Sequence, residues 1–255
     1  TTNKTRIMKE NSSRILTWLY PKDNISRWVN TDELSLFVPK MTKAGLQSSL
    51  FFLQKKKRIL LEKIGSVQTV SITTHGMKAL EQEIPAFSLQ RRQWSGEWWA
   101  VVFLQAPVHD KNFRFLRRIL LAEHTLPLTR GVFLFPGKIS EKVSYELRQS
   151  YEGAVMVAPF KKWTFGDDKE IIGSILQMND LANTYSSISK EISSLLEKEI
   201  DIKSAVHQSK NNISSVFDRL FSTLVNDFGV LHEYYPHVPS GVDLVFSLQS
   251  MSSMG

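Results

Sequence analysis

Residues 42–72 read TKAGLQSSLFFLQKKKRILLEKIGSVQTVSI, and this stretch decides the fold. Leu46, Leu50 and Leu53 recur at the spacing of one face of an α-helix. Thr42 precedes them, and a threonine hydroxyl at this position accepts a hydrogen bond from a free amide of the first helical turn. The stretch therefore predicts a helix that begins after Thr42 and buries a row of leucines.

A basic run and a hairpin follow the predicted helix. Residues 55–58 are four consecutive cations, and positive charge suits the C-terminal end of a helix dipole. Ile59–Leu61 and Val70–Thr73 have the composition of strands, and Gly65-Ser66 between them is typical of a turn. A helix followed by a short hairpin is typical of the recognition helix and wing of a winged helix-turn-helix domain.

Polar side chains on the opposite face of this helix are candidates for contact with DNA. Lys43, Gln47 and Ser48 carry groups that donate to base edges, whereas the basic run and Lys63 suit phosphates, which set affinity and register but not sequence. The alternative is an exposed polar and basic surface without a ligand. The predicted DNA-binding residues are Thr42, Lys43, Gln47, Ser48, Lys55, Lys56, Lys57, Arg58, Lys63, Ser66 and Gln68.

Charge is unevenly distributed along the 255 residues, whose formal net charge is +7. Residues 1–93 contain 16 Lys/Arg and 7 Asp/Glu, whereas residues 94–255 contain 16 and 18. This asymmetry predicts a basic N-terminal domain that meets a polyanion, followed by a near-neutral remainder. Arg91 and Arg92, near the boundary, are expected either to reach the DNA backbone or to lie in a solvated linker.

The composition excludes several classes of site. The chain has no cysteine, which excludes disulfides and thiolate metal sites and fits a reducing compartment. No apolar run of about 18 residues and no secretory signal occur, so we expect a cytoplasmic protein that does not span a membrane. No histidine pair at ligand spacing, phosphate-binding glycine loop or serine nucleophile motif is present. We expect no metal, no cofactor and no enzymatic activity.

The remaining periodicity predicts a multidomain α+β protein. Upstream of residue 42, the pattern predicts helices over Lys9–Tyr20 and Asp32–Phe37 and a turn at Lys40-Met41. A further helix is expected after the hairpin, over Thr74–Glu83. Together these elements predict a winged helix-turn-helix domain over residues 1–87. Residues 94–165 predict a ferredoxin-like domain with the order βαββαβ. Its elements are expected at residues 98–104, 111–122, 125–128, 131–135, 140–151 and 154–158. Residues 166–255 predict an α-helical C-terminal domain, with long helices over 170–197 and 205–225 and a short helix over 242–248.

Four short motifs carry a resemblance to a known family. They are Ser71-Ile72-Thr73-x-x-Gly76, Trp94-x-Gly96-x-Trp98, Phe113-x-x-Leu116-Arg117, and Leu126-Pro127-Leu128-x-x-Gly131-Val132-Phe133-x-x-Pro136. In this order and spacing they resemble the PaaX family of bacterial repressors, named for control of phenylacetic acid degradation. The resemblance spans nearly the whole chain. It implies a winged helix-turn-helix, a middle domain akin to the CRISPR adaptation nuclease fold, and a helical C-terminal domain.

The resemblance also implies a function. We expect an effector-responsive transcriptional repressor that binds double-stranded DNA as a homodimer, with an anionic small-molecule effector such as an acyl-CoA. Arg117, Arg118 and Arg130 are candidates for holding such an anion, with surface solvation as the alternative. Trp98 and Trp99 are interpreted as core and interface residues, with stacking on a small-molecule ligand as the alternative.

Two other readings remain open. One is a divergent metal-dependent nuclease, because the related CRISPR nucleases carry an aspartate at the end of their first strand. Gln105 occupies that position here, and a neutral amide lacks the charge that a hard cation requires, while the nearby Asp110 suits a helix cap. The other is a non-catalytic nucleic-acid-binding adaptor related to CRISPR adaptation proteins.

Overall fold

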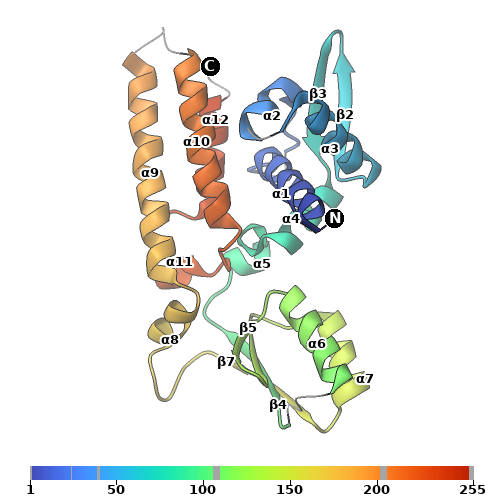
Figure 1. Cartoon of the computed structure of the whole chain (residues 1–255). Helices are drawn as coiled ribbons and strands as arrows, with labels where there is room; N and C mark the ends of the chain where they lie inside the picture. Colours follow the sequence, from blue (N-terminus) through green and yellow to red (C-terminus); the bar gives the residue numbers. More distant parts are fainter. Residues whose placement is uncertain (1, 24, 39–40, 106–109, 202–205, 253–255) are drawn as a thin grey trace. The chain divides into compact units, whose positions relative to one another are not determined.

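The computed structural model describes residues 2–23, 25–38, 41–105, 110–201 and 206–252 (Figure 1). They divide into two units. Unit 1 is Thr1–Phe87, Asp180–Asp227 and His237–Gly255, and unit 2 is Ser88–Asn179 and Phe228–Pro236. Each unit combines helices with one antiparallel sheet, which confirms the predicted α+β class.

The N-terminal part of unit 1 contains three helices before a hairpin. Its elements are α1 (Thr2–Leu19), β1 (Val29–Asn30), α2 (Thr31–Phe37), α3 (Lys43–Lys55), β2 (Ile59–Ile64), β3 (Val67–Ile72), α4 (Thr74–Glu83) and the 3-10 helix η1 (Pro85–Phe87). The strands form an antiparallel sheet in the order β1-β3-β2. Strands β2 and β3 pair from Ile59 opposite Ile72 to Ile64 opposite Val67. Residues 39–40, which include Lys40 of the predicted turn, lie outside the described part.

Helices from the C-terminal part of the chain complete the core of unit 1. These are α9 (Met178–Asp201), α10 (Val206–Leu224) and α12 (Gly241–Ser252). Trp18 stacks on Phe37 with ring centroids 3.5 Å apart, and Phe217 of α10 meets both rings edge-on at 5.2 Å. From α12, Gln249 Nε2 donates to the carbonyl of Trp18 at 2.8 Å. The prediction of a separate helical domain over residues 166–255 differs from this division, because the apolar faces of α10 and α12 bury against the N-terminal helices.

A buried polar pair also stabilises unit 1. Tyr185 of α9 is fully buried and donates a hydrogen bond to Asp227 Oδ2 at 2.8 Å. Burial, and next the charge of Asp227, raise the pKa of Tyr185 well above its usual value of 10. Gly241, at the start of α12, lies so close that a Cβ there would be 2.3 Å from the Tyr185 hydroxyl. Glycine at this position therefore permits α12 to approach α9.

Unit 2 places two helices over one face of a four-stranded sheet (Figure 1). The sheet order is β5-β6-β4-β7, and all its neighbours are antiparallel. Residues of α6, α7 and the facing strands, such as Phe103, Phe113 and Phe133, form one apolar core. The elements of unit 2 are α5 (Leu89–Arg92), β4 (Trp98–Phe103), α6 (Lys111–Ala122), β5 (Leu126–Thr129), β6 (Val132–Pro136), α7 (Glu141–Tyr151), β7 (Val155–Phe160), α8 (Asp168–Ile175) and α11 (Leu231–Tyr234).

Two local predictions were wrong. The helix expected over residues 170–197 is interrupted between α8 and α9, where Gln177 has a φ of 50° and turns the chain. Arg91, expected to reach the DNA backbone or to lie in a solvated linker, is instead part of α5 and is buried. Its guanidinium donates to the carbonyls of Phe228 at 2.8 Å and His124 at 2.7 Å. Arg91 therefore holds segments of unit 2 together and is not available to DNA.

Candidate nucleic-acid interface

Helix α3 begins and buries its leucines as the sequence predicts. Thr42 is the N-cap, and its hydroxyl oxygen accepts from the amide of Gly45 at 3.1 Å. A cap of this kind contributes about 1 kcal/mol to helix stability. Leu46, Leu50 and Leu53 are all buried. The opposite face of α3 is consequently fixed as the one that faces solvent.

That outward face carries the predicted base-reading residues. Lys43, Gln47 and Ser48 are all exposed. The Ser48 hydroxyl donates to the carbonyl of Ala44 at 2.9 Å, so in this conformation it offers lone pairs rather than a proton to a ligand. Because Thr42 is committed to capping, Lys43 and Gln47 are the principal donors on this face.

Phe51 lies on the same outward face, and the sequence prediction did not include it. It stands three residues after Ser48 and four after Gln47, and 66% of its surface is exposed. The helical spacing of the sequence already puts Phe51 on the face of the polar residues and away from the buried leucines, so this residue could have been predicted. An apolar ring in this position offers a surface for apolar groups such as the methyl of thymine.

The basic run turns sharply out of the helix. Lys55 is the last residue of α3, Lys56 is the C-cap, and Lys57 has a φ of 55°, in the left-handed region. Lys56 Nζ lies 5.8 Å from the ring centroid of Phe52. Lys55, Lys56 and Lys57 are exposed, and Arg58 is half-buried. The turn presents the three ammonium groups at the end of α3.

Thr73 and Gly76 hold this turn in place. The Thr73 hydroxyl donates to the carbonyl of Lys57 at 2.7 Å, and its oxygen accepts from the amide of Gly76 at 3.0 Å. The Thr73 amide donates to the carbonyl of Arg58 at 3.0 Å. A Cβ on Gly76 would lie 2.1 Å from that carbonyl oxygen, so only glycine fits. The Ser71-Ile72-Thr73-x-x-Gly76 motif therefore positions the basic run.

The hairpin brings further predicted residues next to α3. Lys63 and Gln68 are directly opposite each other in the β2–β3 register, on the same face as Val70, which is buried. Gln47 Nε2 donates to Gln68 Oε1 at 3.4 Å, a long hydrogen bond that joins helix and hairpin. Ser66 is exposed in the turn, where Gly65 has a φ of 63°.

The electrostatic character of this surface is strongly positive. Residues 42–68 contain six cations (Lys43, Lys55, Lys56, Lys57, Arg58 and Lys63) and one carboxylate, Glu62. None of these cations forms an ion pair within the described part of the chain. A surface of unpaired cations gains by meeting a polyanion, since binding releases the counterions of the polyanion.

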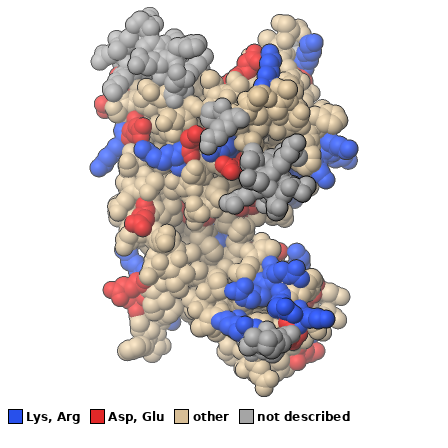
Figure 2. All heavy atoms as spheres, in the orientation of Figure 1, with Lys and Arg blue, Asp and Glu red and all other residues tan. Residues whose placement is uncertain are grey.

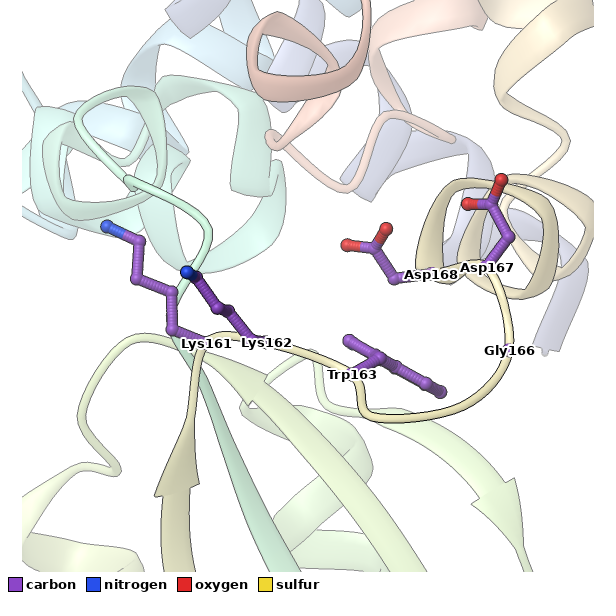
Figure 3. A pocket seen from close by; sticks show the side chains of 6 residues that line it. All are labelled: Lys161, Lys162, Trp163, Gly166, Asp167 and Asp168. Carbon is purple, nitrogen blue, oxygen red and sulfur yellow. The ribbon is translucent and has the colours of Figure 1, made fainter.

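A loop of unit 2 lines an open pocket of about 500 Å³ between β7 and α8 (Figure 3). Its lining combines Lys161 and Lys162 with Asp167 and Asp168, so its charges balance. Asp167 caps α8, and Asp168 accepts from Tyr234 at 3.4 Å. Burial raises the pKa of Tyr234 to about 12, so this hydroxyl keeps its proton into the alkaline range.

The other predicted sites of unit 2 differ in environment. Trp98 is fully buried and lies 3.4 Å from the Tyr234 hydroxyl through Nε1, whereas Trp99 is half-buried. Gln105 is exposed just beyond β4, and Asp110 caps α6 by accepting from the amide of Asn112 at 2.7 Å. Among the described residues, no three His, Asp or Glu side chains gather in a way that would hold a metal ion. Nor does any described helix have the length and apolarity to cross a bilayer.

No protein-family model and no curated protein matches the chain. Among solved structures, the chain is similar to the uncharacterized protein Rv0674 from Mycobacterium tuberculosis, with 12% sequence identity and a TM-score of 0.45. The alignment covers 94% of this chain and 93% of Rv0674. At this score and identity the likeness assigns neither fold nor function.

Proposed function

We propose that the chain is a sequence-specific DNA-binding transcriptional regulator, an effector-responsive repressor that acts as a homodimer. The observation that carries the proposal is the outward face of α3, where Lys43, Gln47 and Phe51 are exposed beside a basic turn and joined to a hairpin by Gln47 and Gln68. A helix of this kind fits the major groove of B-DNA, and the adjacent cations suit the flanking phosphates.

The order of elements supports a winged helix-turn-helix in unit 1. Helices α2 and α3 precede the β2–β3 hairpin, and β1 adds a third strand to it. In this proposal α3 is the recognition helix and the hairpin is the wing. The network around Thr73 supports the proposal further, because it fixes the cations between helix and wing.

The topology of unit 2 supports the proposal that it is a ferredoxin-like domain. Its order β4-α6-β5-β6-α7-β7 and its sheet order β5-β6-β4-β7 are those of a split βαβ arrangement. In the proposal this domain and the C-terminal helices hold the dimer and respond to the effector. An effector releases DNA only if its affinity differs between the DNA-competent and the DNA-incompetent state.

Selection of bound sites from random duplexes by the full chain tests this function. A homodimer with one recognition helix per subunit predicts a palindromic site, with half-sites separated by about one helical turn of 10 to 10.5 base pairs. Recovery of no enriched sequence contradicts sequence-specific binding. An enriched site without symmetry, bound by one copy, contradicts the homodimer.

A further inference from the structure

Helix α6 carries an unusual concentration of positive charge in unit 2. It contains Lys111, Arg114, Arg117 and Arg118 and no carboxylate. Residues 94–255 as a whole hold 18 Asp/Glu against 16 Lys/Arg, so α6 is a local exception in an otherwise acidic part of the chain. The total charge of residues 94–255 does not reveal this local cluster of cations.

The cations of α6 form a stripe that faces solvent. Phe113, Leu116 and Leu120 are buried against the sheet. Lys111, Arg114, Phe115 and Arg118 are exposed at relative positions 0, 3, 4 and 7, and we call this surface the α6 face. It extends about 10 Å along the helix, at 1.5 Å per residue. Figure 2 shows the cations gathered over the helical side of unit 2.

In the described part of the chain, no carboxylate lies within ion-pair distance of the exposed α6 cations. Asp110 is committed to capping α6 and also accepts from the Tyr151 hydroxyl at 3.3 Å. Glu123, at the other end, lies 3.7 Å from Lys142 of α7. The exposed cations of α6 form no ion pair with any described residue. Like charges three and four residues apart repel each other along a helix, so a binding role gives this pattern a reason that folding does not.

The shape of the α6 face favours an extended ligand. The pocket between β7 and α8 does not include α6, and the outward side of a helix is convex. A compact anion would therefore stay exposed to water, whereas an extended polyanion meets several cations at once. Phe115 is 51% exposed, and the Arg118 guanidinium lies 5.9 Å from its ring centroid. Stacking over a ring orients a guanidinium, whose planar fork matches phosphate oxygens.

We propose that the α6 face binds the sugar–phosphate backbone of duplex DNA outside the base pairs that α3 reads. The inference rests on the proposed function and adds to it a second, sequence-independent DNA contact in a different unit. Lys111, Arg114 and Arg118 hold phosphates by charge-assisted hydrogen bonds, and Phe115 packs against the sugars between them.

The test uses the full chain and two labelled duplexes, one trimmed to the selected site and one extended by flanking sequence on both sides. The variant Lys111→Gln/Arg114→Gln/Arg118→Gln removes the three charges from exposed positions. Lys138→Gln/Lys161→Gln/Lys190→Gln removes the same charge from other exposed positions and is the matched control. Affinity is measured by fluorescence anisotropy over a series of salt concentrations, and far-UV circular dichroism checks that each variant folds.

The inference predicts that the α6 variant loses about tenfold or more in affinity for the long duplex. The slope of its log affinity against log salt concentration should become less negative by about 2.7. On the trimmed duplex the α6 variant binds as the wild type does, and the control matches the wild type on both duplexes. Equal affinity of wild type and α6 variant on the long duplex overturns the inference, as does an equal loss on both duplexes. Both results leave the proposed function standing, whereas failure of the wild type to bind either duplex refutes the proposed function itself.

Discussion

Replacing Phe51 distinguishes contacts with DNA bases from electrostatic attraction to the DNA phosphates. Its exposed ring on the outward face of α3 is suited to thymine methyl groups. We expect Phe51→Ala to lower affinity for the selected site while leaving the salt dependence unchanged, because the side chain carries no charge. Measurement of affinity over a salt series for the wild type and the variant checks both parts.

Uracil-substituted DNA sharpens this prediction, since uracil differs from thymine only by the missing methyl group. Replacing the contacted thymines should weaken wild-type binding by a factor of about 4 for each methyl group, equivalent to about 0.8 kcal/mol. The Phe51→Ala variant should bind both DNAs equally. If the variant still discriminates thymine from uracil as strongly as the wild type, another residue reads the methyl group.

Tyr185 gives a prediction about stability. Tyr185→Phe removes the hydrogen bond to Asp227, and we expect the free energy of unfolding to fall by about 1–2 kcal/mol at neutral pH. Urea unfolding followed by circular dichroism measures this change. Ser187→Ala, at an exposed position two residues away in α9, is a suitable control and should leave the midpoint nearly unchanged.

The raised pKa of Tyr185 predicts that the free energy of unfolding decreases at alkaline pH. Above about pH 10 the unfolded chain loses the tyrosine proton while the folded chain keeps it, so the stability from this group is present at lower pH and is lost as pH rises. The stability difference between the wild type and Tyr185→Phe should therefore shrink by about 1.4 kcal/mol per pH unit above pH 10. A difference that stays constant to pH 11 contradicts the shift.

Residue-scale prediction from the sequence was strongest where helical spacing decides burial. The row of leucines in α3, the Thr42 cap and the exposure of Lys43 and Gln47 all follow from periodicity. Arg91 was missed because its partners are backbone carbonyls more than 30 residues away along the chain, and no local pattern encodes such contacts. The exposure of Phe51 could have been predicted, because the helical spacing that places Gln47 on the outward face of α3 also places Phe51 there.

At the scale of elements, Gly76 couples α4 to the basic turn. Gly76→Ala places a Cβ against the carbonyl of Arg58, and the backbone of one segment has to move. We expect a loss of about 1–3 kcal/mol in stability, together with weaker DNA binding on every sequence as Lys57 and Arg58 shift. Thermal unfolding and anisotropy measure the two effects.

Gly173→Ala is the control for this change. Gly173 lies inside α8, and a Cβ there would come no closer than 4.0 Å to Met178 Cβ. Alanine in a helix interior stabilises it by roughly 0.5–1 kcal/mol relative to glycine, so this variant should be at least as stable as the wild type. A melting temperature for Gly76→Ala equal to that of Gly173→Ala contradicts the close approach.

Elements with clear caps were predicted to within one or two residues. The predicted bounds of α4 and α6 coincide with those observed, and Ser140 caps α7 where the sequence expected that helix to start. The interruption at Gln177 was not predictable, because neither glycine nor proline marks it and the apolar period continues across it. Strand β1 was missed because two residues carry too little pattern.

At the scale of the whole molecule, the two compact units do not follow the order of the sequence. Residues 180–227 and 237–255 are far from the N-terminus in sequence but share a core with α1 and α2. Periodicity shows that α10 has an apolar face, but it does not show which partner covers that face. Replacing Phe217 of α10 should therefore destabilise the packing of Trp18 and Phe37 along with α10 itself.

That expectation is testable with Phe217→Ala, which leaves a cavity beside two aromatic rings. We expect a loss of about 3–5 kcal/mol in the free energy of unfolding. Tryptophan fluorescence, to which Trp18 contributes, and helical circular dichroism should report one cooperative transition for unit 1. Loss of helical signal without any change around Trp18 contradicts a shared core.

The central claim is that the basic turn after α3 holds the phosphates of DNA, and a salt titration of Lys55→Gln/Lys56→Gln tests it most directly. Two lost phosphate contacts predict lower affinity on all sequences and a slope of log affinity against log salt concentration that is less negative by about 1.8. Lys138→Gln/Lys190→Gln, with the same change in charge, should retain the wild-type slope. A slope for Lys55→Gln/Lys56→Gln equal to that of the wild type would remove the basic turn from the interface and contradict the account.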